Sequence, residues 1–315
     1  MADPSYKPPS ANDVAKAQNL DANLKLLLAQ RRLYSKTKIW TSVRGVGVGV
    51  VAIGAPILTA IWPEAAVPAA TVAAVWYALN HVLFKFLERR GATRAATIQE
   101  QFDTTIFGMP TIAVRELRVL PEDISQLTGA GAGARASRRY AYSIERLRDW
   151  YSIQQNVPGA VAIAIAQRGN VAYSRRLLDR NAALWFGLLV AWAIMAVTIS
   201  IASGFSLATF LLVVAIPVMP PLLDAWDEFQ KVRAAGRERE ALANEIQDAI
   251  SANRTAPIQP EQLVAWQSQL FALRRDAPLV PDWLYNLLRD RNETEMSDAA
   301  RALGQDAQTR KEDIE

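Results

Sequence analysis

The feature that most constrains this chain is a stretch of 43 residues, from Asn181 to Leu223, that contains no Asp, Glu, Lys or Arg. A helix crosses the ~30 Å hydrocarbon core of a bilayer with ~20 residues, so the stretch is about twice as long as one span requires. Ser203-Gly204-Phe205-Ser206, near its middle, has the composition of a turn. The pattern therefore predicts two membrane spans, near residues 182–202 and 205–223, joined by a tight turn.

The first third of the chain repeats this design. Residues 45–62 and 65–84 are apolar and uncharged, and Pro63-Glu64 forms the expected turn between them. Lys and Arg flank both hairpins and are missing from both turns, and positive residues beside spans mark the cytoplasmic side. We therefore expect a multi-pass protein with both termini in the cytoplasm. A soluble helical protein with buried core helices is the alternative interpretation.

Outside the spans, apolar residues recur at helical spacing, and no sustained alternating pattern of a strand is present. We expect an all-α membrane protein with four transmembrane helices in two hairpins and a helical cytoplasmic domain built from the central insertion and both termini. The expected divisions are an N-terminal amphipathic helix (1–42), the first hairpin (43–86), a central helical region (87–180), the second hairpin (181–223), C-terminal helices (224–304) and a disordered tail (305–315).

Three finer predictions concern the cytoplasmic helices. Tyr140, Ile144, Leu147 and Tyr151 recur at helical spacing and predict one helix after a flexible loop at the glycines of residues 129–133. Residues 157–166 are apolar but too short to span a membrane, which predicts a buried helix of the cytoplasmic domain. The sequence VPDWLY, residues 280–285, predicts the start of a short last helix.

The sequence offers little for catalysis. The chain has no cysteine, which excludes disulfides and thiolate chemistry, and no metalloprotease, P-loop or serine-hydrolase motif. Its single histidine, His81, lies near the end of the second expected span, where a polar interfacial role is typical. Residues 1–37 lack the apolar core of a cleaved signal peptide. We expect no catalytic residue, no metal site and no enzyme activity.

Arginine is concentrated in the central region. Residues 87–180 hold 14 arginines, no lysine and nine acidic residues. Because guanidinium groups form bidentate bonds to phosphates and stack on flat rings, this composition favours a phosphate-bearing ligand. Two alternatives remain open. A GC-rich genome also produces an excess of arginine, and arginines on helix surfaces are commonly solvated or salt-bridged.

Several motifs, in their order along the chain, resemble a known family. They are QEQFDTTIFGMP at residues 99–110, ERLRDWYS at 145–152, QRGN at 167–170 and VPDWLY at 280–285. The sequence is similar to the SMODS-associating four-transmembrane effector family, the membrane effectors of bacterial CBASS antiphage systems. The similarity runs from about Leu27 to Arg291.

The resemblance implies a sequence of events at the bacterial inner membrane. A partner nucleotidyltransferase makes a cyclic di- or oligonucleotide, which the effector binds in its cytoplasmic part. The effector then oligomerises and disrupts the lipid bilayer, so that the cell dies or stops growing. No other cofactor, and no DNA or RNA polymer, is expected as a partner.

On this hypothesis, five arginines contact phosphates, two aromatic residues stack on bases and one amide adds a polar contact. These ligand-binding candidates are Arg146, Arg148, Trp150, Tyr151, Arg168, Asn170, Arg175 and Arg176. Gln167 to Asn170 have the alternative role of capping a helix, and Arg175 and Arg176 that of setting topology. Two other functions remain open, a constitutive four-span channel or transporter and a structural membrane adaptor. The few polar residues in the spans weaken the first of these.

Overall fold

The computed structural model describes residues 6–110, 120–129, 143–202, 204, 206–211, 215–253 and 255–312. No strand occurs within these ranges, which agrees with the all-α expectation. The elements are α1 (Ala11–Gln18), α2 (Asp21–Ile61), η1 (Pro63–Ala65), α3 (Ala66–Leu79), the π-helical turn η2 (Asn80–Phe84), α4 (Lys85–Ile106), α5 (Pro121–Thr128), α7 (Gly159–Ala202), α8 (Leu207–Phe210), α9 (Ile216–Ala252), α10 (Pro260–Arg275) and α11 (Asp282–Glu312).

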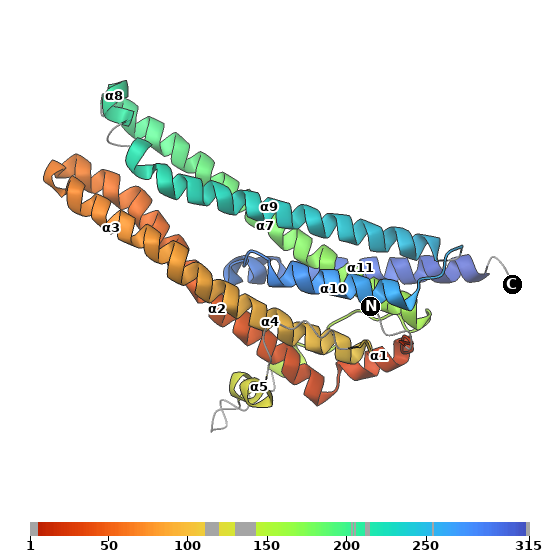
Figure 1. Ribbon diagram of the computed structural model, residues 1–315. Coiled ribbons are helices and arrows are strands. Elements are labelled where there is room, and N and C mark those ends of the chain that lie inside the picture. Colours follow the sequence, from red (N-terminus) through yellow and green to blue (C-terminus); the bar gives the residue numbers. More distant parts are fainter. Residues whose placement is uncertain are drawn as a thin grey trace.

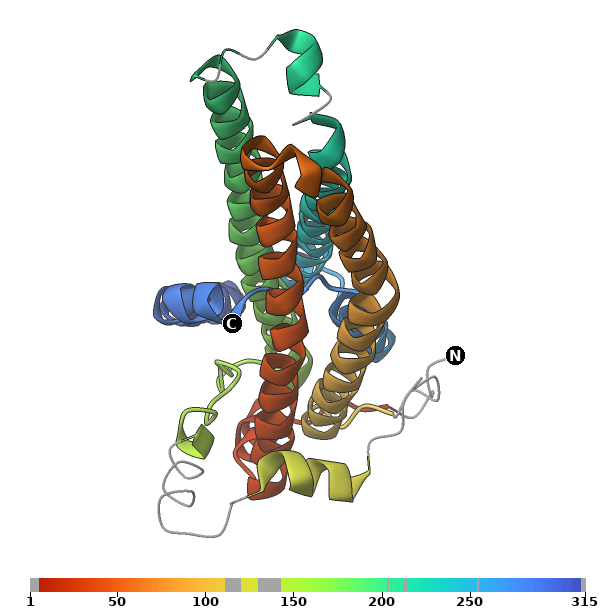
Figure 2. The same ribbon diagram turned by 90° about the vertical axis from the view of Figure 1, so that its left-hand side faces the viewer.

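Two long helix pairs extend from one end of a helical body (Figure 1). α2 turns through η1 into α3, η2 and α4, and α7 returns through α8 into α9. We call the two apolar ends of these pairs the first extension (residues 45–84) and the second extension (182–223). α1, α10 and α11 pack at the other end, against the long helices, and Figure 2 shows the four long helices running in nearly the same direction.

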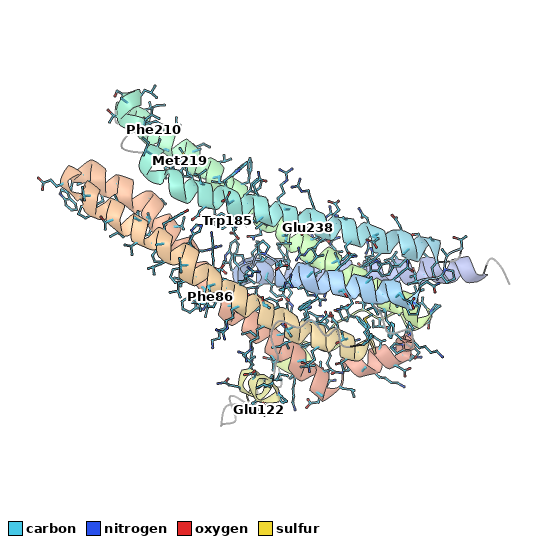
Figure 3. The ribbon with its side chains drawn as sticks, in the orientation of Figure 1. Phe86, Glu122, Trp185, Phe210, Met219 and Glu238 are labelled. Carbon is cyan, nitrogen blue, oxygen red and sulfur yellow. The ribbon has the colours of Figure 1, made fainter. Side chains whose placement is uncertain are left out.

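Large apolar side chains are exposed along both extensions. Val67 is 76% exposed and Ile201 is 77% exposed. Figure 3 labels Trp185, Phe210 and Met219 on the second extension, where Met219 is exposed and Trp185 packs partly buried against a smaller apolar cluster. A contiguous exposed apolar surface of this kind marks a membrane or partner surface. By length and composition, two stretches within the described residues, Val67–Ile106 and Gly159–Ala202, are long and apolar enough to cross a membrane. These two stretches are consistent with a membrane location, while the four-span arrangement stays a prediction.

The body has one main hydrophobic core, to which α1, α2, α4, α7, α9, α10 and α11 contribute. Leu27 of α2, Phe102 of α4, Ile163 of α7, Ile246 of α9 and Leu263 of α10 are fully buried in it. They come from the amphipathic faces that the helical spacing indicates, and burial of such faces is the main source of helix stability in a folded protein. The core therefore joins the two helix pairs below the extensions.

The buried helix expected at residues 157–166 is present from Gly159 onward, but it does not end before Gln167. These residues lead into and form the first turns of α7, which continues without a break through Gln167 and Asn170 into the second extension. Gln167 does not cap a helix end, because its Nε2 donates to the carbonyl oxygen of Leu263 at 3.0 Å and to Oε1 of Gln267 at 3.1 Å. Packing against α10 keeps this segment helical where its mixed sequence suggested an end.

The disordered tail is also wrong for residues 305–312, because α11 continues to Glu312. The last expected helix is therefore long and not short. Gly304, where the disorder was expected to begin, is buried, and a Cβ there would lie 2.7 Å from Cγ of Gln154. Gln305 and the residues after it include Ala, Gln, Arg, Lys and Glu, all strong helix formers, so the helix needs no apolar core to continue.

Candidate functional site

A cavity of about 580 Å³ lies where the two helix pairs meet the body. Its walls come from α2, α7, α9, α11, the end of α10 with the loop after it, and the irregular segment 146–152. A cavity of this size is large enough for a nucleotide-sized ligand, since small-molecule sites are typically ~300–1,000 Å³.

The lining of the cavity combines cations with flat rings. The cations that line it are Arg31, Lys38, Arg146, Arg148, Arg239 and Arg274. The aromatic residues are Tyr34, Trp150, Tyr151, Tyr173 and Tyr285. Two carboxylates, Asp149 and Asp282, also line it. This combination suits an anion that carries flat rings, because guanidinium groups bind phosphates and aromatic faces stack on bases.

The segment 146–152 is held by α1 and is not helical, so the expected helix through Leu147 and Tyr151 is wrong in this part. Oδ1 of Asn19 accepts from the Asp149 backbone N–H at 3.0 Å, and Oε1 of Gln18 accepts from the Tyr151 N–H at 2.9 Å. Asp149 has a positive φ of 50°, which a helix excludes. Side chains from α1 thus replace the helical hydrogen bonds. Residues 130–142, with the glycine-rich loop and Tyr140, lie outside the described residues.

α1 itself is a separate helix, which corrects the single N-terminal helix expected within residues 1–42. It ends at Gln18, and α2 begins at Asp21. Nδ2 of Asn23 donates to the carbonyl oxygen of Ala17 at 2.8 Å, across the break. The break places Gln18 and Asn19 beside the segment that lines the cavity, which one straight helix would not do.

A buried polar cluster lies beneath the cavity. The hydroxyl of Tyr151 donates to Oδ1 of Asp103 at 2.7 Å, and Nη1 of Arg274 lies 2.6 Å from Oδ2 of the same carboxylate. Glu100 and Gln267 complete the cluster, with Nε2 of Gln267 donating to Glu100 at 2.7 Å. Burial raises the pKa of the Tyr151 phenol, and the Asp103 charge raises it further. Tyr151 therefore stays a neutral hydrogen-bond donor at neutral pH.

Arg274 is almost fully buried, with 7% of its side chain exposed. Burial alone lowers the pKa of its guanidinium, but Asp103, Tyr151 and Glu100 raise it above its usual value. The contact between Arg274 and Asp103 is a buried ion pair. Arg274 is thus held charged by carboxylates on α4.

Five of the eight predicted ligand-binding residues line the cavity: Arg146, Arg148, Trp150, Tyr151 and Asn170. Of these, Tyr151 is buried, and its ring faces Phe107 of the core at a centroid distance of 5.6 Å. Nδ2 of Asn170 donates to the Tyr151 hydroxyl at 3.3 Å. The structure therefore brings these five together, although their roles toward a ligand stay proposals.

The other three predicted residues do not line the cavity. Arg175 lies 3.5 Å from Asp179 and 2.7 Å from Glu240, and Arg176 forms an ion pair with Glu295 of α11. Arg168 is half-buried, and burial, with the nearby charge of Arg176, lowers its pKa. Arg175 and Arg176 are thus engaged by carboxylates of the protein itself.

Seven of the cationic and aromatic residues that line the cavity were not among the predicted ones: Arg31, Tyr34, Lys38, Tyr173, Arg239, Arg274 and Tyr285. A signal was available for three of them, since Arg31, Tyr34 and Lys38 share one face of α2 at i, i+3 and i+7. Arg239 and Arg274 carried no local signal, because they reach the cavity only after α9 and α10 have packed on α7.

The two helix pairs also touch where the extensions leave the body. Arg44 of α2, 8% exposed, lies 3.6 Å from Glu88 of α4 and 3.2 Å from Glu228 of α9. The buried guanidinium of Arg44 therefore attracts one carboxylate from each of the two helix pairs.

A second polar contact lies beside it. Asp224 of α9 accepts from Nδ2 of Asn80 at 3.1 Å and lies 3.7 Å from Nζ of Lys85. Nε2 of His81 lies 3.1 Å from Nζ of Lys85 and 3.8 Å from Oδ1 of Asp224. We call these two groups of residues the hairpin contacts.

These features define a class of protein: it is all-helical, it has an apolar membrane part, and its helical body holds a cavity lined by cations and aromatic rings. The sequence profile of the SMODS-associating 4TM effector domain matches residues 12–303, so the chain belongs to that family. A probable CBASS effector molecule of Bacillus cereus (strain VD146) is 22% identical over 294 residues, which cover 89% of this chain and 94% of the relative. No solved structure matches the chain. The family resemblance of the sequence motifs is thereby confirmed.

Proposed function

We propose that this protein is a ligand-gated membrane effector of antiphage defence. A cyclic di- or oligonucleotide, made on infection by a partner nucleotidyltransferase, binds the cavity in the cytoplasmic body. Binding changes how the two hairpins pack, the protein oligomerises, and the inner membrane loses its integrity. The relative in Bacillus cereus, described as a probable CBASS effector, supports the antiphage setting.

The observation that carries this proposal is the position of the cavity. It is lined by α2 and by α7 and α9, and each of these helices continues into one of the apolar extensions. A ligand in the cavity therefore contacts both hairpins at once, close to where they leave the body. A ligand shifts a conformational equilibrium only through such differential contacts.

We further propose that both extensions span the bilayer, as four spans with both termini in the cytoplasm. Among the described residues, the exposed side chains of the two extensions are largely apolar, which is the surface that lipid requires. The ion pairs and charged side chains of the hairpin contacts lie at the ends of the extensions, where headgroups and water begin. Four spans enclose no wide aqueous path alone, which is why oligomerisation belongs to the proposal.

The topology is testable because the chain has no natural cysteine. We expect Glu64→Cys and Ser206→Cys, in the two turns, to react with a membrane-impermeant maleimide added outside spheroplasts. Asn244→Cys, an exposed position of α9 in the body, is the matched control and should react only after lysis. Labelling of Asn244→Cys in intact spheroplasts, or protection of either turn, would contradict the four-span arrangement.

We propose that the hairpin contacts hold the two hairpins together when no ligand is bound. Arg44 attracts Glu228 of the second hairpin, and Asp224 attracts Asn80 and Lys85 of the first. These side chains are mostly buried, so the attraction is weakly screened by salt. Binding in the cavity has to overcome these contacts before the hairpins separate.

Dye release from liposomes that contain the purified protein tests the whole proposal. We expect release when one member of a panel of cyclic di- and trinucleotides is added, and no release in its absence. Release without any nucleotide would indicate a constitutive pore. No release and no binding with every member would contradict the gated-effector function and favour an adaptor.

A further inference from the structure

Most cations that line the cavity are already neutralised by the protein. Lys38 lies 2.7 Å from Asp282, Arg148 lies 2.9 Å from Glu145, and Arg274 is paired with Asp103. Arg146, on the exposed rim, also interacts with another group of the protein. For any of these to bind a phosphate, the phosphate has to compete with a contact that exists.

Arg31 and Arg239 differ from the other four. Among the described residues, neither lies within ion-pair distance of a carboxylate. Arg31 comes from α2 and is partly exposed, and Arg239 comes from α9 and is only 3% exposed. A buried cation is costly unless an anion accompanies it, so Arg239 is where an external anion gains most.

The bonds that Arg239 makes leave it charged and partly available. Its Nη1 donates to the carbonyl oxygen of Ala235 at 2.8 Å and its Nη2 to that of Leu273 at 2.5 Å. Carbonyl oxygens satisfy these donors but carry no net charge, and a guanidinium has further N–H groups to offer. Burial lowers the pKa of Arg239 to about 10, which still leaves it protonated at neutral pH.

Arg31 stands beside an aromatic platform. Its Cζ lies 5.8 Å from the centroid of the Tyr285 ring, and Nζ of Lys38 lies 5.4 Å from the same centroid. The ring attracts the guanidinium, whose N–H groups can still bond to a phosphate. A ligand with a flat base finds rings and a cation together at this side of the cavity.

Tyr34 connects the two arginines. It follows Arg31 by one turn on the same face of α2, and it lines the cavity as both arginines do. Burial raises the pKa of the Tyr34 phenol to about 12, against the lowering effect of the Arg274 and Arg239 charges. Asp149 is the acidic lining residue that is closest in sequence to Arg146 and Arg148, and it is exposed. Its Oδ1 accepts a hydrogen bond from Nδ2 of Asn19 at 2.8 Å.

We propose that Arg31 and Arg239 are the principal anion contacts of the cavity and that the ligand carries at least two separate phosphate groups, one for each arginine. The inference rests on the proposed function and assigns its ligand site to residues outside the arginine-rich central segment. One molecule would then join α2 of the first hairpin to α9 of the second. A ligand with a single phosphate would satisfy only one of the two.

A ligand that bridges Arg31 and Arg239 would also connect the cavity to the hairpin contacts. Arg31 lies on the same helix as Arg44, and Arg239 lies on the same helix as Glu228 and Asp224. A doubly anionic ligand that draws α2 and α9 together at the cavity would change their angle at the other end, because long helices move as rigid rods. The hairpin contacts lie farther along the same two helices, so that change would alter them.

Isothermal calorimetry on the full-length protein in nanodiscs tests the inference. The probes are a panel of cyclic di- and trinucleotides, with cyclic AMP as the ligand that carries one phosphodiester. Loss of one charged hydrogen-bonding partner should weaken the binding cyclic oligonucleotide about 10- to 100-fold in Arg31→Gln and in Arg239→Gln. Arg239→Lys should recover part of the loss, since it keeps the charge, and cyclic AMP should bind more weakly than the oligonucleotide.

Arg237→Gln is the matched control, because Arg237 is exposed on α9 and does not line the cavity. Thermal unfolding of each variant separates lost binding from lost folding. Wild-type affinity in Arg31→Gln or in Arg239→Gln would overturn the bridging ligand and leave the proposed function standing. Tight binding of cyclic AMP, equal to that of the oligonucleotide, would overturn the requirement for two phosphates. Absence of binding by the wild-type protein to every cyclic oligonucleotide would remove the proposed function, and this inference with it.

Discussion

Arg44→Met is expected to release dye from liposomes without any nucleotide. Arg44 is the cation that Glu88 of the first hairpin and Glu228 of the second share. Its removal leaves two mostly buried carboxylates close together on different helix pairs, and breaking a buried ion pair typically costs ~3–5 kcal/mol. Since the two carboxylates then repel each other, the hairpins separate at the hairpin contacts.

Two further variants show whether charge is the cause. Adding Glu88→Gln and Glu228→Gln to Arg44→Met removes the repulsion and should restore a tight membrane. Arg89→Met, which removes an exposed cation of α4 with no ion pair among the described residues, should behave as the wild type. If liposomes with Arg44→Met release no dye until nucleotide is added, the hairpin contacts do not hold the hairpins together in the absence of ligand.

Arg274→Met is expected to produce the largest loss of stability. The substitution removes the cation that is buried beside the carboxylates of Asp103 and Glu100. The penalty for such uncompensated charges is ~3–5 kcal/mol, and for a domain of this size that corresponds to a drop in thermal unfolding midpoint on the order of 10 °C. The measurement is thermal unfolding of the full-length protein in detergent.

The matched comparison is Arg301→Met, which removes a surface ion pair with Asp298 in which both side chains are more than half exposed. Exposed pairs contribute about 0–1 kcal/mol, so its midpoint should barely move. Arg274→Met combined with Asp103→Asn and Glu100→Gln should regain much of the loss, because neutral groups replace the unmatched charges. A midpoint for Arg274→Met equal to that of Arg301→Met would contradict the account of the buried cluster.

Much of the architecture was predictable because helix formation and membrane preference are local properties. The uncharged run from Asn181 to Leu223 and its counterpart at residues 45–84 coincide with the two apolar extensions. Pro121 and Pro260 start α5 and α10 as proline at a first helical position does. The errors in helix length at α7 and α11 arose because a polar or charged interval need not end a helix whose residues are good helix formers.

The site was predictable only in part. Arg148 and Trp150 were chosen because arginines and aromatic residues alternate in one motif, and both line the cavity. Arg175 and Arg176 belong to an equally basic motif but face Glu240 and Glu295, more than 60 residues away in sequence. No local pattern reports such a partner, so the charge of a segment does not reveal which of its arginines remain available.

The sequence by itself determined the helical class, the two apolar hairpins and the concentration of arginine between them, because hydropathy, helix propensity and composition are carried by neighbouring residues. Tertiary structure alone decided which cations face the cavity and which are neutralised. That outcome depends on where α9, α10 and α11 pack, and it brings Arg31, Arg239 and Arg274 to one cavity from helices that are far apart along the chain.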